Sequence, residues 1–227
     1  MDVRELAAML DQTLLKPMTG FAEGRAWIAE NAELGFASLC VSPFLVPEAT
    51  ELLAATSTSV CSVVSFPLGY ATSESKSDEA AVLVGLGCTE VDMVINVAAL
   101  LEGEDEYVRR DIEGVTRVVE LLSEGRGLVK VILETGLLGP DDIRRGCELS
   151  VRAGAKFVKT STGFGPRGAS VADVELMRAT VGPGIGVKAA GGVRTLEAAL
   201  DLIDAGASRI GTSAGSALLE AAAERGR

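Results

Sequence analysis

Residues 153–159 read Ala153-Gly154-Ala155-Lys156-Phe157-Val158-Lys159, a glycine between small residues followed by a run suited to a β-strand. A glycine just past a helix supplies the left-handed backbone that ends the helix, so this stretch predicts a helix-to-strand junction. The same pattern occurs at Leu34-Gly35-Phe36, Leu86-Gly87-Cys88 and Ala205-Gly206-Ala207. Four junctions of one kind indicate an array of βα units.

Further strand-like runs lie between these junctions. They cover Val60 to Phe66, Leu128 to Glu134 and Ile185 to Ala190, with a shorter run from Asp11 to Leu14. Eight strands then begin near positions 11, 36, 60, 90, 128, 156, 185 and 208. Their mean spacing of about 28 residues is close to the ~30 residues of a βαβ repeat.

Amphipathic stretches separate the predicted strands. The run from Glu106 to Ser123 places apolar residues on one stripe, as in a helix packed on a sheet; they are Val108, Ile112, Val115, Val119 and Leu122. Pro140 is typical of the first turn of a helix, and Ser170 and Thr195 are typical of helix N-caps. Strand and helix therefore alternate throughout.

Apolar strands that alternate with helices indicate a parallel sheet covered by helices, which is either a doubly wound sheet or a (β/α)8 barrel. The eight units and the lack of a domain-scale linker favour the barrel. We predict an α/β fold, a single-domain (β/α)8 TIM barrel over residues 1–227. The doubly wound alternative has one dinucleotide fingerprint, at Gly163 to Gly168. Pro166 interrupts that fingerprint, and Lys188 stands where an acidic ribose ligand is expected.

The chain has no histidine. This excludes Ser-His-Asp and Cys-His catalysis and histidine-containing zinc sites, so acid–base chemistry must use carboxylates, lysines, thiols, hydroxyls or water.

The chain is acidic, with 21 Lys and Arg against 32 Asp and Glu and a net charge of −11. A nucleic-acid partner is not expected, because the phosphate backbone requires a basic face.

The cysteines favour a reducing compartment. Cys40, Cys61, Cys88 and Cys147 form no CxxC pair, and no secretory pattern precedes them. The uncharged run from Leu52 to Ser73 is long enough to span a bilayer, but its many serines and threonines favour loop and strand. We therefore expect a soluble cytoplasmic protein with reduced thiols, no metal site and no membrane partner.

Ionisable residues lie inside four consecutive predicted strands. Asp92 lies in the first of them, and Lys130, Lys159 and Lys188 lie in the next three. Parallel strands are usually apolar on both faces, so a charge inside one needs a reason. The lysines are 29 residues apart in each case, about one βα unit. We therefore expect them at equivalent levels on neighbouring strands inside the barrel.

The use of lysine at these positions favours covalent chemistry. The chain has six lysines and 15 arginines, yet three of the six lysines occupy these strands. Arginine stays protonated, whereas lysine can become the neutral amine that attacks a carbonyl to form a Schiff base. A second ammonium about 4 Å away lowers a lysine pKa by roughly three units, which is enough to supply that amine. Lys159 and Lys188 are both candidate nucleophiles, and Asp92 is the candidate proton carrier.

A structural interpretation competes with the catalytic one. Asp92, the three lysines and Glu134 could form an ion network that fills the barrel, because buried charges pair. Two features favour an active site instead. Glycines follow the last two strands, at Gly191-Gly192 and between Gly211 and Gly215, where barrels commonly bind phosphate. Hydroxyl groups follow Lys159 at positions 160–162 and suit a polyol or phosphate ligand.

Eight motifs follow one another along the chain. They are 11–17 (Asp-Gln-Thr-Leu-Leu-Lys-Pro), 40–43 (Cys-Val-Ser-Pro), 66–69 (Phe-Pro-Leu-Gly), 90–96 (Glu-Val-Asp-Met-Val-Ile-Asn), 129–135 (Val-Lys-Val-Ile-Leu-Glu-Thr), 157–165 (Phe-Val-Lys-Thr-Ser-Thr-Gly-Phe-Gly), 187–195 (Val-Lys-Ala-Ala-Gly-Gly-Val-Arg-Thr) and 209–213 (Arg-Ile-Gly-Thr-Ser). In this order they resemble the deoxyribose-phosphate aldolases, a class I aldolase family, over nearly the whole chain.

The resemblance implies a (β/α)8 enzyme that reversibly cleaves 2-deoxy-D-ribose 5-phosphate to D-glyceraldehyde 3-phosphate and acetaldehyde, with no metal or cofactor. It implies that Lys159 forms the Schiff base and that Asp92 is the acid–base residue. Lys188 is then the pKa-lowering cation, which also takes part in proton transfer, and Lys130 supports the site. The implied sugar contacts are Asp11, Thr13, Cys40 and Thr162, and the implied phosphate contacts are Gly163, Gly191, Gly192, Gly211 and Ser213. By the same analogy we expect a homodimer.

The chain departs from the family pattern at several positions. Gln12 stands where the family often has a histidine, and we expect this change to cost a side chain of the pocket wall. Ser42, Ser65 and Ala190 replace the more usual Asn, Gly and Ser or Pro, and the chain ends in Arg227 rather than the tyrosine of many members. None of these residues is implied in bond making, so we expect altered packing, rate or substrate tolerance.

Two other functions fit part of the pattern. One is a Schiff-base lyase acting on a different phosphorylated sugar, which a substrate panel would separate. The other is a non-catalytic sugar-phosphate-binding protein, which would show thermal stabilisation by ligand without turnover. The complete set of Asp92, Lys159 and Lys188 argues against the second.

Overall fold

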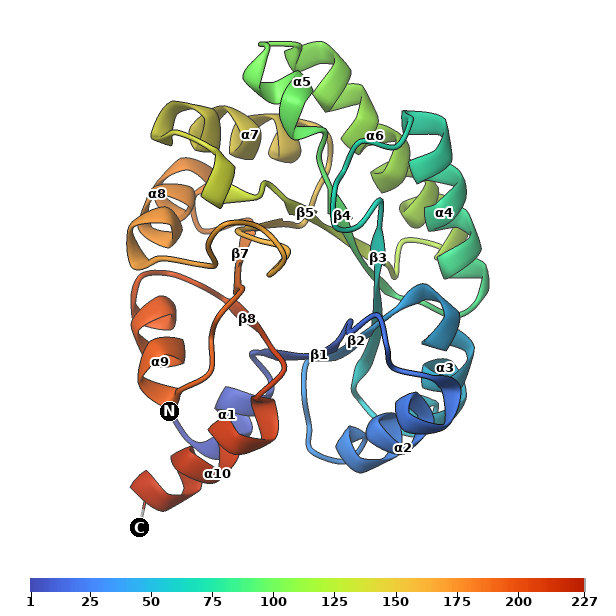
Figure 1. The fold of residues 1–227 in the computed structure, drawn as a ribbon, viewed down its shortest axis with the longest axis vertical. Helices are drawn as coiled ribbons and strands as arrows, with labels where there is room; N and C mark the ends of the chain where they lie inside the picture. Colours follow the sequence, from blue (N-terminus) through green and yellow to red (C-terminus); the bar gives the residue numbers. More distant parts are fainter. Residues whose placement is uncertain (227) are drawn as a thin grey trace.

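Short runs rich in valine, isoleucine and leucine form parallel strands that close into one barrel in chain order (Figure 1). The computed structural model describes residues 1–226. The strands are β1 (Leu10–Leu14), β2 (Ser38–Val41), β3 (Ser59–Val64), β4 (Glu90–Val94), β5 (Leu128–Ile132), β6 (Phe157–Lys159), β7 (Gly186–Ala190) and β8 (Arg209–Thr212). The predicted single-domain (β/α)8 barrel is confirmed, and the doubly wound alternative is wrong because β8 pairs with β1.

Helices surround the barrel and follow the strands along the chain (Figure 1). The helices are α1 (Val3–Ala7), α2 (Phe21–Asn31), α3 (Val46–Leu53), α4 (Ser73–Gly85), α5 (Val97–Leu101), α6 (Asp105–Leu122), α7 (Pro140–Arg152), α8 (Val171–Val181), α9 (Leu196–Asp204) and α10 (Gly215–Arg225), with 3-10 turns η1 (Pro43–Leu45) and η2 (Thr135–Leu137). The Ser170 and Thr195 side chains accept backbone N–H groups at the starts of α8 and α9, which confirms both predicted caps. No helix of residues 1–226 is both long and apolar enough to cross a bilayer.

The apolar core lies between the strands and the helices rather than inside the barrel. In β4, Val91 and Met93 belong to this core, whereas the alternate residues Glu90 and Asp92 face the barrel interior. The alternation follows from the pleat of a strand, in which successive side chains point to opposite faces. The interior is therefore free to hold polar side chains, and it holds charged ones.

The register of the strands places the three lysines unevenly. Lys159 of β6 pairs with Lys188 of β7, as equal spacing predicts. Lys130 of β5 pairs with Asp92 of β4 on one side and with Phe157 of β6 on the other. The β5 residue that pairs with Lys159 is Ile132, two positions after Lys130. The expectation of equivalent levels is therefore wrong for Lys130, because the registers of neighbouring strand pairs need not follow the spacing along the chain.

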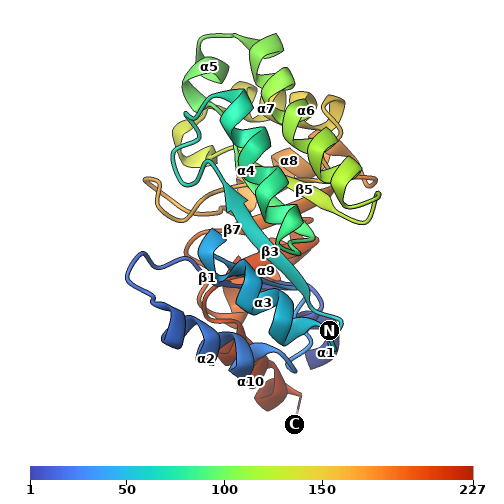
Figure 2. The same cartoon turned by 90° about the vertical axis from the view of Figure 1, so that its right-hand side faces the viewer.

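A second buried ion pair lies outside the barrel, between α4 and α6, which run side by side along its flank (Figure 2). Lys76 donates to Asp111 at 2.5 Å and to the carbonyl of Val94 at 2.9 Å, and both charged side chains are fully buried. Among the described residues Lys76 has Asp111 as its one ion-pair partner, so the pair is separate from the charges inside the barrel and provides a comparison for the ion pairs found there.

Candidate active site

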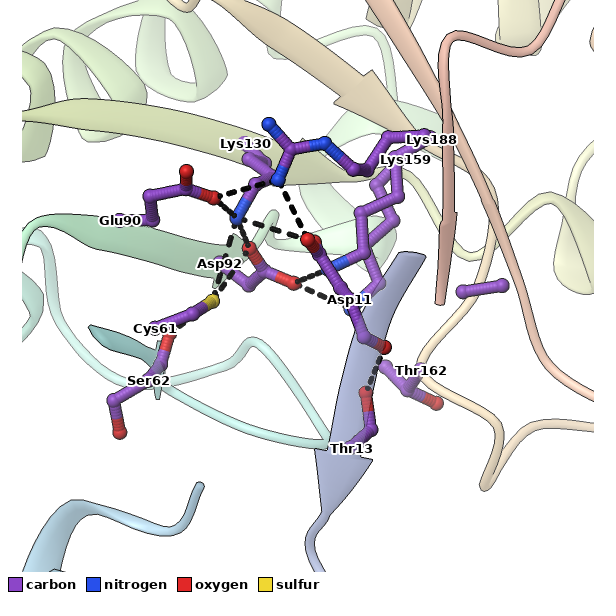
Figure 3. A network of polar contacts seen from close by, with 12 residues as sticks. Asp11, Thr13, Cys61, Ser62, Glu90, Asp92, Lys130, Lys159, Thr162 and Lys188 are labelled. Carbon is purple, nitrogen blue, oxygen red and sulfur yellow. Dashed lines mark hydrogen bonds and ion pairs between the residues drawn. The ribbon is translucent and has the colours of Figure 1, made fainter. Parts of the chain in front are cut away.

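Asp92 is the centre of a charged network inside the barrel (Figure 3). Its Oδ2 accepts hydrogen bonds from Lys159 and Lys188, each at 2.7 Å. Its Oδ1 accepts one from Lys130 at 2.9 Å. The sequence predicted that these four residues would meet, and the structure brings them together on four neighbouring strands.

Further charged residues lie beneath this centre, toward the amino ends of the strands. Lys130 pairs with Glu90 at 2.6 Å, and Lys188 pairs with Asp11 at 2.5 Å. Arg209 donates to both carboxylates and lies over the ring of Phe157, 5.3 Å from its centroid. The sequence analysis did not identify Glu90 or Arg209. The period of two along β4 was the available signal for Glu90, which shares a face with Asp92.

The network has one more cation than it has carboxylates. Its carboxylates are Asp11, Glu90 and Asp92, and its cations are Lys130, Lys159, Lys188 and Arg209. Three negative charges against four positive charges leave a surplus of one positive charge when every group is ionised. The loss of one lysine proton would make the interior neutral, which burial favours.

Burial and charge pairing act in opposite directions on the pKa of each group. Burial raises the pKa of Asp92, but attraction to Lys130, Lys159 and Lys188 outweighs burial and holds the pKa well below 3.8. Burial lowers the pKa of Lys130 and of Lys188, but Asp11 and Asp92 outweigh it, so both lie above 10.5. The sequence argument considered two ammonium groups alone, whereas the structure places a carboxylate between them.

These shifts predict that the network stabilises the fold equally across a broad pH range. Carboxylates with lowered pKa values stabilise the fold above the unfolded value of 3.8, and that contribution is lost as pH falls further. Lysines with raised pKa values stabilise it below 10.5, and that contribution is lost as pH rises further. Urea unfolding should therefore give a flat free energy between about pH 5 and 8, above which the contribution of the buried thiols with raised pKa values also begins to be lost. A steep loss inside that interval would contradict these pKa directions.

A pocket opens above the network at the carboxyl ends of the strands. Lys159 lines it and is the lysine of the network that reaches it. The pocket also contains every residue predicted to bind phosphate and two of those predicted to contact the sugar. These residues are Thr13, Thr162, Gly163, Gly191, Gly192, Gly211 and Ser213. Arg194 also lines the pocket, and the sequence analysis did not identify it, although it lies two residues after the predicted Gly-Gly turn.

Two predicted sugar contacts lie elsewhere. Asp11 and Cys40 are fully buried and do not line the pocket. Asp11 instead pairs with Lys188 and Arg209 beneath it. Asp11 therefore acts on the site through Lys188. Cys40 packs in a small apolar cluster with Cys61 and Val63, against which Leu15 and Phe66 lie.

Two glycines of the pocket are required by close approach. Gly191 has φ 91°, and a Cβ there would lie 2.9 Å from the Cα of Gly168. A Cβ at Gly211 would lie 3.1 Å from the Cε of Lys188. Any side chain at Gly211 would press on the lysine that holds Asp92.

Glu134 contacts Thr162 of the pocket and does not belong to the ion network. Both the backbone N–H and the hydroxyl of Thr162 donate to its carboxylate. Glu134 has φ 58°, a left-handed conformation that turns the chain after β5. The interpretation of Glu134 as a partner of the lysines is therefore wrong, and its contacts orient Thr162.

The residues that depart from the family pattern lie at different places in the structure. Gln12 does not line the pocket; it donates to Asn31 at 3.1 Å and accepts from the N–H of Gly215 at 2.9 Å. The expected loss of a pocket-wall side chain is therefore wrong, because Gln12 faces the helices. Ser65 has φ 52°, which explains why glycine is usual there. Arg227, the terminal residue in place of the usual tyrosine, lies outside the described residues.

The arrangement can perform amine catalysis. A lysine at the base of a pocket contacts a carboxylate that can carry protons, and the opposite wall offers glycines, hydroxyls and a guanidinium to an anion. Among residues 1–226, one group of side chains is close enough to hold a metal ion: Cys40, Cys61 and Asp92.

Comparison with known proteins gives one consistent result. Residues 6–221 match the model of the DeoC/LacD family aldolases. The chain is similar to the deoxyribose-phosphate aldolase of Enterococcus faecalis, with 50% identity over 98% of this chain and 99% of that one. It is similar to the enzyme of the same name from Bacillus cytotoxicus, with 50% identity over 94% of each chain.

Solved structures agree. An aldolase described as QR15 superposes with a TM-score of 0.90 at 35% identity and covers 97% of both chains. The deoxyribose phosphate aldolase of Aeropyrum pernix, described as a unique tetramer, superposes with a TM-score of 0.87 at 34% identity. That match covers 97% of this chain and 92% of the Aeropyrum chain.

Proposed function

Because the chain belongs to the DeoC/LacD family of aldolases, we propose that it reversibly cleaves 2-deoxy-D-ribose 5-phosphate to D-glyceraldehyde 3-phosphate and acetaldehyde through a Schiff base on Lys159. Membership of that family makes the chain an enzyme, a carbon–carbon lyase. The relatives' names supply the substrate of the proposal, and the geometry of the network supports its mechanism.

The position of Lys159 carries the proposal. Lys159 lines the pocket, and among the described residues its one ion-pair partner is Asp92. Lys188 pairs with two carboxylates and Lys130 with three, and both lysines are fully buried. Lys159 is therefore the lysine of the network with the fewest ion pairs, and it lies where a substrate carbonyl can reach it.

The reaction then follows from the contacts of Lys159. Its neutral Nζ attacks the C1 carbonyl of the open-chain sugar, and the resulting carbinolamine loses water to form an iminium ion. A base removes the proton of the C3 hydroxyl, the C2–C3 bond breaks, and D-glyceraldehyde 3-phosphate leaves while the electron pair forms an enamine. Protonation at C2 and hydrolysis release acetaldehyde and restore the amine.

Asp92 is the group placed to carry these protons. Its Oδ2 contacts both Lys159 and Lys188, so a proton can pass between the lysines through one carboxylate or a water beside it. Lys188 also keeps a positive charge near Asp92, which favours the ionised carboxylate. Lys130 and Asp11 hold Asp92 and Lys188 in position from below.

Arg194 gives a testable prediction about the phosphate. Its guanidinium can pair with the dianion at the pocket wall, while the bond-making groups lie at the base. Arg194→Gln should raise KM for the phosphorylated sugar by about 5- to 20-fold and leave kcat within about twofold, because the interaction is partly exposed. The exposed Arg117, on α6, offers the control Arg117→Gln. An unchanged KM would show that Arg194 does not contact the phosphate.

The direct test of the proposed function is a substrate panel. The purified chain is incubated with 2-deoxyribose 5-phosphate, ribose 5-phosphate, unphosphorylated 2-deoxyribose and a ketohexose bisphosphate. Triose-phosphate release is followed with a coupled dehydrogenase, and for unphosphorylated 2-deoxyribose, which yields no triose phosphate, acetaldehyde release is followed with alcohol dehydrogenase. We expect turnover with the first compound and much slower turnover with the others. Faster cleavage of the ketohexose bisphosphate would assign the site to a different sugar.

The homodimer and the cytoplasmic location remain part of the proposal, which also includes a role in deoxyribonucleotide catabolism. Their support is the family resemblance.

A further inference from the structure

Two cysteines face each other inside the barrel, below the pocket. Cys40 of β2 is the register partner of Cys61 of β3, and both thiols are fully buried. With Val63 they form a small cluster separate from the main apolar core. Neither residue lines the pocket, and neither takes part in the reaction proposed above.

The two sulfur atoms and Asp92 have the spacing of metal ligands. Both Sγ atoms and a carboxylate oxygen of Asp92 lie within 4.8 Å of one another. The Sγ of Cys61 is 3.4 Å from Oδ1 of Asp92. In a tetrahedral zinc site, bonds of ~2.3 Å to sulfur and ~2.1 Å to oxygen place these ligand atoms about 3.6 Å apart. The observed spacing therefore requires only small side-chain adjustments.

A cation already lies against two of these three ligands. Lys130 Nζ donates to Cys61 Sγ at 3.3 Å and to Asp92 Oδ1 at 2.9 Å. The same ammonium also contacts Glu90 at 2.6 Å and Asp11 at 3.5 Å. It can therefore move off the sulfur and Asp92 without losing every carboxylate partner. The space between Cys61 and Asp92 therefore already accommodates a positive charge.

We propose that Cys40, Cys61 and Asp92 form a binding site for a thiophilic divalent cation, Zn²⁺, and that its occupation inhibits the enzyme. Binding forms two zinc–thiolate bonds and one zinc–carboxylate bond, and the two thiol protons leave to solvent. No group is oxidised or reduced. Because one dication replaces two protons, the net charge of the barrel interior does not change. Sulfur ligands select zinc over Mg²⁺ and Ca²⁺, which prefer oxygen.

Inhibition follows from the shared carboxylate. Zinc on Oδ1 of Asp92 displaces the hydrogen bond from Lys130 and neutralises part of the negative charge of the carboxylate, whose other oxygen, Oδ2, bonds Lys159 and Lys188 in the proposed reaction. Entry is expected to be slow, because Lys159 lies between Asp92 and the pocket and both thiols are fully buried. The inhibition should therefore develop over time.

The test uses the reduced, full-length chain in buffer free of chelators and thiols. After incubation with ZnCl₂ and removal of free metal, we expect one zinc per chain by elemental analysis and a gradual loss of activity that EDTA reverses. MgCl₂ should have no such effect. Co²⁺ in place of zinc should produce sulfur-to-cobalt charge-transfer absorption, a readout that does not depend on turnover.

Cys61→Ser and Cys40→Ser should each weaken zinc binding at least about tenfold and remove the cobalt–sulfur absorption. Cys147→Ala, which removes a buried thiol from α7, should leave both unchanged. Zinc binding that is as tight in both serine variants as in the unaltered chain would overturn the proposal, as would the absence of cobalt–sulfur absorption in the unaltered chain. Two variants are used so that poor folding of one leaves the other as the test. Metal binding is measured without substrate, so it can fail or succeed independently of the proposed aldolase function.

Discussion

Lys159→Ala is expected to lower kcat by at least about 10⁴-fold, because removal of a covalent nucleophile can cost on the order of 10⁶-fold. Without the amine there is no iminium ion to accept electrons from the breaking C2–C3 bond. The residues of the phosphate wall remain, so the variant should still bind the sugar phosphate. The measurement is the coupled triose-phosphate assay at saturating substrate, with binding followed by thermal stabilisation.

The variant should also fold. Lys159 has Asp92 as its one ion-pair partner among residues 1–226, and its removal leaves three cations against three carboxylates. Lys156→Ala is the matched control, since it removes an exposed lysine three residues away. A folded Lys159→Ala protein with activity close to that of the control would assign the nucleophile to another residue.

Asp92→Asn is expected to reduce both stability and turnover. The substitution removes the charge that three buried lysines share, and breaking a buried ion pair by deleting one partner costs about 3–5 kcal/mol. Loss of the proton carrier should also lower kcat by about 10²- to 10⁴-fold. Urea unfolding and the coupled assay measure the two effects on the same preparation.

Asp111→Asn separates these two effects. It removes a carboxylate from the buried pair with Lys76, between α4 and α6. We expect a similar loss of unfolding free energy, about 3–5 kcal/mol, but a kcat for the folded protein within about twofold of the unaltered chain. If both variants lose turnover equally, the effect of Asp92→Asn comes from instability and not from proton transfer.

Much of the fold could be predicted because its signals are local. A glycine such as Gly154, with φ 88°, needs the left-handed conformation whatever surrounds it. Side-chain caps such as Ser170 also depend on residues three positions away. The short helices α1 and α5 were not predicted, since five residues carry too little periodicity. The level of Lys130 was wrong because strand register depends on contacts between segments far apart in the chain.

The residues of the candidate site also divide into those that the sequence could predict and those that it could not. Asp92 and the three lysines were evident because a charge inside an apolar strand is unusual. Arg209 was not identified, because an arginine at the start of a strand is ordinary until its partners, Asp11 and Glu90, are known. The contacts of Gln12 depend on which face of its strand points to the helices, and those of Cys40 depend on which side chains meet it inside the barrel. These are properties of the closed barrel.

The central claim is that Lys159 supplies the amine that attacks the substrate. Incubation of the chain with acetaldehyde and borohydride should reduce the Schiff base to a stable secondary amine, and peptide mass spectrometry should locate the adduct. The account predicts one ethyl group per chain on Lys159 and none in Lys159→Ala. Full trapping in Lys159→Ala, or an ethyl group on Lys188 in the unaltered chain, would contradict it.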